Sequence, residues 1–254
     1  SWYLPQTKRD AKAEYRAAHI PHAVFFDIDD LSDETSPLPH MLAQAPKFAS
    51  RMRKLGLSDG NLIVVYDGAG IYSAARAWWM LRAMGHEDVV VLDGGFPKWR
   101  REDRPVEDLV ASPYPRHFTS RLNNALLCGI DQVKRNLSAP LAPVIDARSA
   151  PRFRGEEQEP RAGVRRGHIP ASLNVPYTEL TAQDGTLLPP DALKAVFKKH
   201  GVDPARPSIA SCGSGVTASI VLLALDVLGA KDVALYDGSW AEWGADQSAP
   251  IETG

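Results

Sequence analysis

One order of motifs occurs twice along this chain, and this duplication limits the possible folds more than any other feature. Each half has a His-Ile-Pro tripeptide, an apolar run, a glycine-bearing loop, a helical stretch, a second apolar run and an Asp-Gly pair with tryptophan close behind. The loops begin at Asp67 and Cys212, 145 positions apart, and the Asp-Gly pairs begin at Asp93 and Asp237, 144 positions apart. Solenoid repeats are only about 20–50 residues long, so this pattern indicates a duplicated domain.

Each half alternates short apolar strands with amphipathic helices, which predicts an α/β fold of two tandem domains. Each domain is expected to be a mostly parallel sheet flanked by helices. Near-continuous apolar runs at 62–66 and 88–92 are typical of strands buried on both faces. In such sheets, ligands bind beyond the carboxyl ends of the strands, where the loop that starts at Cys212 is predicted to lie.

The domain boundaries follow from composition. We predict an N-terminal domain at 1–110, a linker at 111–124 and a C-terminal domain at 125–254, since the stretch from 100 to 124 is charged and proline-bearing. A strand at 143–148 precedes the second His-Ile-Pro tripeptide, and the first half has no counterpart to it. We therefore expect the equivalent first strand of the N-terminal domain to be missing from this sequence.

The loop at 212–217 has the sequence Cys-Gly-Ser-Gly-Val-Thr and separates a short apolar run from a helical pattern at 218–228. Its glycines allow successive backbone N–H groups to point inward, and the helix adds its positive N-terminal end. Such a cradle stabilises an anion, and the thiolate of Cys212 is the nearest candidate. The sequence therefore predicts a nucleophilic cysteine. A small buried side chain in an ordinary turn is the alternative.

Composition excludes several classes of function. The net charge of −2 gives no general attraction to nucleic acids or anionic membranes. No apolar run approaches the ~20 residues that span a bilayer. Two cysteines are too few for a disulfide framework or a cysteine-rich zinc site, and the scattered histidines lack metal-ligand spacing. We expect no metal, no cofactor and a reducing cytoplasmic location, with Cys128 as a buried structural thiol.

Together, the tandem domains, the loop at 212–217 and the ending Tyr-Asp-Gly-Ser-Trp at 236–240 resemble the two-domain sulfurtransferases of the rhodanese superfamily. The resemblance covers essentially the whole chain. Within this family the loop is similar to that of the members that use 3-mercaptopyruvate. It implies that Cys212 takes sulfur from that donor, releases pyruvate and passes the sulfur from a persulfide to a thiol such as thioredoxin, or to cyanide. Asp67 stands in the cysteine position of the first half, which implies a non-catalytic domain.

The same resemblance implies the remaining site residues. Arg152 and Arg161 match arginines that hold the substrate's carboxylate and carbonyl, and arginine pairs with carboxylates in a bidentate way. On their own, these residues also fit a solvated charged loop. Ser214, His40 and Asp29 match a relay that resembles the one of serine proteases and would protonate the pyruvate anion. The other loop residues expected to contact substrate are Gly213, Gly215, Val216 and Thr217.

Four other functions fit the sequence less well. Members of the family that use thiosulfate typically carry Arg and Lys at the positions of Gly213 and Ser214, so the neutral loop here argues against thiosulfate as the best donor. A cysteine phosphatase or arsenate reductase needs an arginine six positions after the cysteine, and residue 218 is alanine. A non-catalytic binding module is disfavoured by the intact cysteine loop. A nucleotide-binding glycine loop lacks the third glycine and the downstream acid.

Overall fold

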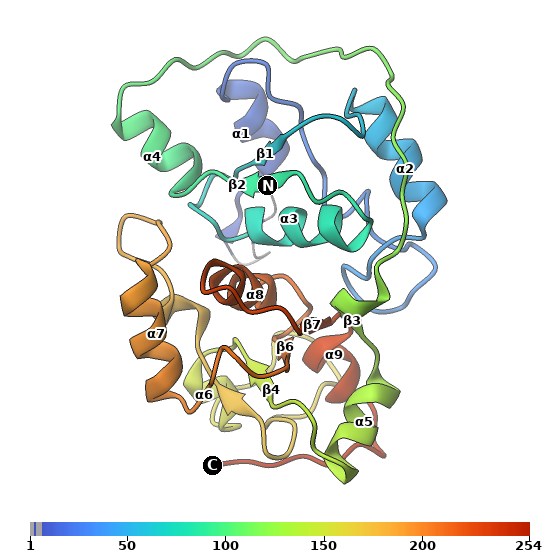
Figure 1. Cartoon of the computed structure of the whole chain (residues 1–254), viewed down its shortest axis with the longest axis vertical. Coiled ribbons are helices and arrows are strands. Elements are labelled where there is room, and N and C mark those ends of the chain that lie inside the picture. Colours follow the sequence, from blue (N-terminus) through green and yellow to red (C-terminus); the bar gives the residue numbers. More distant parts are fainter. Residues whose placement is uncertain (1–2, 4–6) are drawn as a thin grey trace. The chain divides into compact units, whose positions relative to one another are not determined.

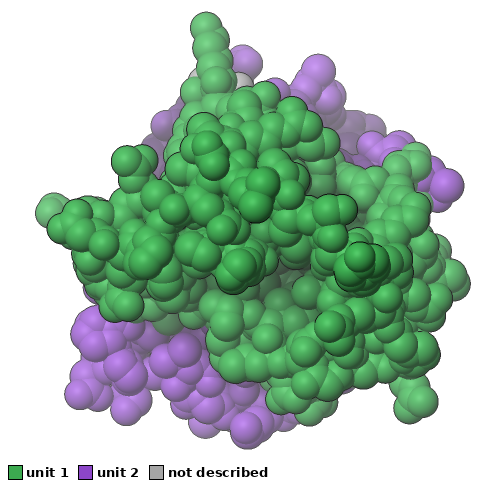
Figure 2. All heavy atoms as spheres, turned by 90° about the horizontal axis from the view of Figure 1, so that it is seen from above, with its two compact units in different colours: residues 1–34, 42–123, 183–187 green, residues 35–41, 124–182, 188–254 purple. Residues whose placement is uncertain are grey.

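The computed structural model describes residue 3 and residues 7–254 (Figure 1). The chain divides into two compact units, coloured separately in Figure 2, and each is described here by itself. Unit 1 comprises residues 1–34, 42–123 and 183–187, and unit 2 comprises residues 35–41, 124–182 and 188–254. The predicted division into a domain at 1–110, a linker at 111–124 and a domain at 125–254 stays a prediction.

In its described part, unit 1 has a parallel pair of strands, β1 and β2, in which Ile63 pairs with Val89 and Val65 with Val91. Helix α3 is buried almost all round, which explains its apolar sequence, with Trp79, Met80 and Leu81 at most 1% exposed. The elements of unit 1 are α1 (Ala11–Ala17), α2 (Ala45–Lys54), β1 (Ile63–Val65), α3 (Ala74–Ala83), β2 (Val89–Val91) and α4 (Gly95–Arg101).

Unit 2 contains a five-stranded sheet in the order β3-β7-β6-β4-β5, and every neighbouring pair is parallel. The predicted α/β class with a mostly parallel sheet is therefore confirmed. The elements of unit 2 are η2 (Asn124–Leu126), β3 (Leu127–Cys128), α5 (Ile130–Ser138), β4 (Val144–Asp146), α6 (Ala150–Phe153), β5 (Leu173–Asn174), η3 (Tyr177–Glu179), α7 (Pro190–Lys199), β6 (Ser208–Ser211), α8 (Ala218–Val227), β7 (Val233–Tyr236) and α9 (Ser239–Trp243).

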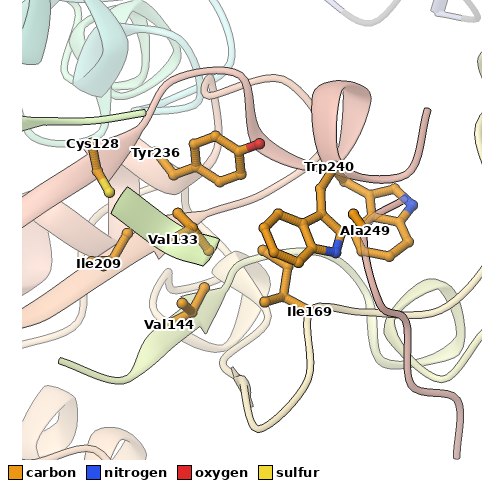
Figure 3. Close-up of a cluster of buried hydrophobic side chains, with 9 residues drawn as sticks. Cys128, Val133, Val144, Ile169, Ile209, Tyr236, Trp240 and Ala249 are labelled. Carbon is orange, nitrogen blue, oxygen red and sulfur yellow. The ribbon is translucent and has the colours of Figure 1, made fainter. Parts of the chain in front are cut away.

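A cluster of buried side chains packs one face of this sheet against α5 and α9 (Figure 3). Val144 and Ile209 come from the sheet, Val133 from α5, and Trp240 from α9. Cys128 belongs to the same cluster and is 5% exposed, and burial raises the pKa of its thiol to about 11. Cys128 is therefore a buried structural thiol, as its apolar neighbours in sequence predict.

The duplication persists in detail at the two His-Ile-Pro tripeptides. The Nδ1 atom of His19 lies 2.7 Å from the carbonyl oxygen of Tyr15, and that of His168 lies 2.8 Å from the carbonyl oxygen of Phe153. Each imidazole stacks on the ring of that same residue, at 4.1 Å and 3.8 Å between centroids. These shared contacts show that the two tripeptides have the same local structure in both repeats.

None of the helices that the structure describes is sufficiently long and apolar to cross a membrane. The predicted strand runs at 62–66, 88–92 and 143–148 each contain an observed strand, and the stretch between α4 and η2 has no helix or strand longer than an isolated bridge. The extended conformation expected for the proline-bearing segment therefore agrees with the structure.

Candidate active site

The loop that starts at Cys212 lies at the carboxyl end of β6, an interior strand of the unit 2 sheet, and leads directly into α8. Cys212 itself is 2% exposed. Gly215 has a φ of +77°, in the left-handed region that glycine adopts without a steric cost, which explains the second glycine of the loop. The predicted strand–loop–helix context of the cysteine is therefore present.

Backbone bonds from α9 hold this loop in place. The N–H of Trp240 donates to the carbonyl of Cys212 at 2.9 Å, and that of Ala241 donates to the carbonyl of Gly213 at the same distance. The N–H of Cys212 donates to the hydroxyl of Ser239 at 3.2 Å. The carbonyl groups of Cys212 and Gly213 thus point toward α9, and the N–H groups of Gly213 and Ser214, which share their peptide planes, face the opposite direction.

Most N–H groups of the loop have no acceptor. Across the described chain, no acceptor is found for the backbone N–H groups of Gly213, Ser214, Val216, Thr217 and Ala218. Unsatisfied donors at the N-terminus of a helix, where the helix dipole is positive, form a binding place for an anion. This arrangement agrees with the cradle predicted from the glycines.

The first repeat contains the same loop with a carboxylate inside it. Asp67 is fully buried, and its Oδ1 atom accepts a hydrogen bond from the N–H of Ala69 at 2.7 Å. Its Oδ2 atom accepts from the N–H groups of Ser73 at 2.6 Å and Ala74 at 2.8 Å, and from the hydroxyl of Ser73 at 3.3 Å. A covalently attached anion therefore occupies the cradle of unit 1.

The two loops can be compared residue by residue at the offset of 145. The three N–H groups around Asp67 correspond to those of Ser214, Ala218 and Ser219 in unit 2. The first two have no acceptor, while the third donates to the carbonyl of Val216 at 3.2 Å. The side chain of Cys212 starts from the position equivalent to that of Asp67, on which the donors of unit 1 converge.

Arg152 reaches the loop from α6. A Cβ atom built on Gly213 would lie 3.2 Å from the Nη2 atom of Arg152, so the guanidinium rests against the bare Cα of this glycine. Arg152 also pairs with Glu159, whose side chain is 4% exposed, through Nη2–Oε2 at 2.5 Å. Glu159 in turn accepts from Arg148, which pairs with Asp146 at 2.7 Å. A buried chain of alternating charges therefore positions Arg152.

Arg161 has a different environment. Its guanidinium makes no hydrogen bond or ion pair with any side chain in the described part of the protein. Burial lowers its pKa, Cys212 and Glu159 act in the opposite direction, and the nearby charge of Arg152 lowers it further. Arg161 is thus within electrostatic range of Cys212 and has donors available for an anionic ligand.

Two residues at this site were missed by the sequence analysis. Glu159 lies in the acidic loop between the two arginines, and only its buried pairing distinguishes it from neighbours such as Glu156, which is exposed and pairs with Arg154. Tyr177 is the other. Burial raises the pKa of its hydroxyl, Arg152 lowers it and Cys212 raises it, so Tyr177 belongs to the same group of charges. No sequence pattern marks it.

The other predicted site residues have the following places. Ser214 and Val216 are buried in the loop, and Thr217 is the N-cap residue of α8. His40 has a φ of +59° and belongs to unit 2, whereas Asp29 belongs to unit 1. Among the described residues no group of three or more His, Cys, Asp or Glu side chains could hold a metal ion. The roles assigned to these residues stay predictions.

Comparison with known proteins gives consistent matches. The model of the rhodanese-like domain family matches residues 9–102 and 130–246. The chain is 47% identical over 247 residues to 3-mercaptopyruvate sulfurtransferase of Escherichia coli. The aligned region covers 97% of this chain and 88% of that relative. It is 44% identical over 245 residues to the human protein of the same name, with 96% and 82% covered. It is 43% identical over 256 residues to rat thiosulfate sulfurtransferase, with 100% and 85% covered.

Among solved structures, the crystal structure of Tum1 protein from Saccharomyces cerevisiae is similar to the whole chain. The TM-score is 0.91 at 35% sequence identity, and the match covers 100% of this chain and 90% of that one. The similarity therefore extends over both repeats and includes the loop at 212–217.

Proposed function

Because this chain belongs to the rhodanese-like domain family, we propose that it is a sulfurtransferase with 3-mercaptopyruvate as its donor. The thiolate of Cys212 attacks the thiol sulfur of the donor, and the carbon–sulfur bond breaks. The electron pair of that bond leaves with the carbon as the enolate of pyruvate, which then takes up a proton. The transferred sulfur remains on Cys212 as a persulfide until a thiol such as thioredoxin, or cyanide, attacks the outer sulfur and regenerates the thiolate.

One observation carries this proposal: the first repeat holds a carboxylate in the loop where the second repeat has Cys212. Backbone N–H groups that bind a carboxylate also stabilise a thiolate or a persulfide anion, because charge-assisted hydrogen bonds are stronger than neutral ones. They are fixed before the reaction starts, so they need no reorganisation during sulfur transfer.

The two arginines have different roles in this proposal. Arg161 binds the carboxylate of 3-mercaptopyruvate, because the N–H groups of its guanidinium make no hydrogen bond to a side chain in the described part of the protein. Arg152 is held by Glu159 against Gly213 and directs its remaining donors at the carbonyl oxygen of the substrate, where negative charge develops as the enolate forms. Gly215, Val216 and Thr217 shape the loop around the transferred sulfur.

Protonation of the enolate is assigned to Ser214, with His40 as proton shuttle and Asp29 as the carboxylate that orients the imidazole. The assignment follows the resemblance of these three positions to the relay of the family. An imidazole is suited to this task because each of its two ring nitrogens can carry the proton in turn.

A second candidate donor is thiosulfate, since a relative of that name is 43% identical over the full chain. The limited room for a side chain at Gly213 argues against thiosulfate as the better donor. A Cβ atom at this position would lie 3.2 Å from the Nη2 atom of Arg152, so any side chain here requires the guanidinium of Arg152 to shift. The double change Gly213→Arg with Ser214→Lys should therefore raise the ratio of thiosulfate to 3-mercaptopyruvate turnover.

We also propose a cytoplasmic location, which rests on the two unpaired cysteines, Cys128 and Cys212.

Intact-mass measurement after addition of 3-mercaptopyruvate tests the proposal. We expect one extra sulfur on the wild-type protein and none on Cys212→Ser. Cys128→Ser should also gain one sulfur, because the thiol of Cys128 lies in the hydrophobic cluster and burial raises its pKa. The same Cys212→Ser protein should release no pyruvate. Near-normal pyruvate release by this variant would rule out the nucleophile.

A further inference from the structure

The two repeats hold their corresponding loops in different ways. In the first repeat, Asp67 and Gly70 pair with each other as an isolated antiparallel bridge, so the loop is joined across its own base. Cys212 and Gly215 have the same positions in the second repeat, and among the described residues no such bridge joins them. The backbone of these two residues is bound instead by two buried serine hydroxyls.

Ser239, the first residue of α9, binds the first of this pair. Its Oγ atom accepts a hydrogen bond from the N–H of Cys212 at 3.2 Å and donates one to the carbonyl of Tyr236 at 2.8 Å. Its side chain is 0% exposed. Because the hydroxyl accepts in one direction and donates in another, it cannot rotate without losing a bond, and it fixes the direction of the N–H of Cys212.

Ser219, in the first turn of α8, binds the second residue of the pair. Its Oγ atom donates to the carbonyl of Gly215 at 3.1 Å, and its side chain is also fully buried. Gly215 precedes the helix, so this bond ties the loop to the first turn of α8. The two hydroxyls thus hold, from two different helices, the two positions that the first repeat joins directly.

The first repeat has neither hydroxyl. Gly95 stands 144 positions before Ser239, and Ala74 stands 145 positions before Ser219. Gly95 and Ser239 both have a φ of +51°, in the left-handed region. This conformation costs a residue with a side chain about 1–2 kcal/mol and costs glycine almost nothing. The second repeat therefore carries a serine at a position where glycine would avoid this cost.

The side chain of Ser239 also needs room that the first repeat does not have. A Cβ atom built on Gly95 would overlap with the carbonyl oxygen of Gly70 and would lie 2.6 Å from that of Asp67, whereas real Cβ atoms keep at least 3.0 Å from such neighbours. Ser239 has this Cβ atom at the same φ. The carbonyl oxygens of the Cys212 loop therefore cannot take the positions of their counterparts, and this loop is wider beside α9.

From these observations we propose that Ser239 and Ser219 are positioning residues that hold the Cys212 loop open for sulfur transfer. The inference rests on the proposed role of Cys212 as the nucleophile. A loop around a fixed carboxylate can close on itself, but a loop that gains and loses a sulfur atom needs room and N–H groups that stay available. Each serine binds a backbone group of the loop, so each acts through the position of Cys212 and its neighbours.

Ser239→Gly and Ser219→Ala test the proposal, because each introduces the residue of the first repeat. Both should fold, since glycine relieves the strained φ and alanine favours the helix. The measurement is alkylation of Cys212 by iodoacetamide, followed by mass spectrometry of its peptide. We expect each variant to react about tenfold more slowly than wild type at pH 7, because displaced N–H groups stabilise the thiolate less well.

The pH dependence separates this effect from a merely structural one. At pH 10 an ordinary cysteine thiol is ionised without help from the loop, so both variants should react there at nearly the wild-type rate. A loss of access to Cys212 would slow the reaction equally at both pH values. With 3-mercaptopyruvate, kcat should fall about tenfold while KM stays within twofold, because the carboxylate of the substrate is bound by Arg161 and not by the serines.

Ser172→Ala is the matched control in the same unit. Its hydroxyl donates to the carbonyl of Ile169, three residues earlier, at 2.6 Å, as that of Ser239 does to Tyr236, but it does not bind the Cys212 loop. This variant should react like wild type at both pH values.

The proposal is overturned if Ser239→Gly and Ser219→Ala react like wild type at pH 7, if they are slowed equally at pH 7 and pH 10, or if Ser172→Ala is slowed as much. Alkylation needs no sulfur donor, so its outcome is separate from that of the proposed function. A wild-type protein that gains no sulfur from 3-mercaptopyruvate would refute the donor, and the alkylation rates would still decide the role of the two serines.

Discussion

If the buried carboxylate of Asp67 holds the loop of the first repeat together, its removal should destabilise unit 1, and this effect can be measured without any substrate. Asp67→Ala removes the acceptor of three backbone N–H groups and one hydroxyl in a fully buried place. Each buried donor that loses its partner costs about 1–3 kcal/mol. Water that enters the polar space can hydrogen-bond to these donors and so reduces this cost. The variant also no longer has to bury a carboxylate, which offsets a further part of the loss. We expect a net loss of roughly 3 kcal/mol in the free energy of unfolding of unit 1.

For a unit of roughly 120 residues, this loss lowers the Tm by about 10 °C, because the unfolding entropy is about 2 cal/mol/K per residue. Differential scanning calorimetry measures it directly. The same variant leaves an empty anion cradle, so sulfate should raise its Tm by several degrees at about ten times the dissociation constant. Wild-type protein should gain much less, because the carboxylate of Asp67 already occupies the cradle.

Asp30→Ala is the matched control. Asp30 pairs with Arg51 at 2.7 Å, but its side chain is 45% exposed, so its removal should cost at most about 1 kcal/mol and create no response to sulfate. The interpretation of the loop as an anion cradle is refuted if Asp67→Ala unfolds like wild type and sulfate stabilises both proteins equally.

The remaining predictions concern unit 2. Glu159→Gln should raise the KM for 3-mercaptopyruvate about tenfold while circular dichroism shows a folded protein, because Arg152 loses its ion pair; an unchanged KM would contradict the positioning role. Gly213→Ala should also raise KM, since its methyl group meets Arg152 at 3.2 Å, whereas Gly60→Ala, which meets nothing within 4 Å, should not; equal KM values would remove this steric argument. Burial raises the pKa of Glu242, so its contribution to stability is present below the ordinary glutamate pKa and is lost as the pH rises through the folded value. Denaturant unfolding should thus find Glu242→Gln more stable than wild type at pH 7 and equal to it near pH 4, and a gain that does not depend on pH would disprove the assignment.

The sequence by itself determined the duplication, the α/β class and the strand–loop–helix context of Cys212. These features depend on local patterns: apolar runs of strand length, glycines where the backbone must turn, and one order of motifs repeated at an almost constant offset. Even the identity of the buried thiol at Cys128 followed from its apolar neighbours.

Only the tertiary structure decided which charged groups meet. Glu159, and not Glu156, is the partner of Arg152, because packing buries one carboxylate and leaves the other exposed. The four donors around Asp67 and the contact of Arg152 with Gly213 likewise depend on how the backbone folds back on itself. Hydrogen bonds and ion pairs depend on distances of a few ångströms, which sequence spacing within a loop does not fix.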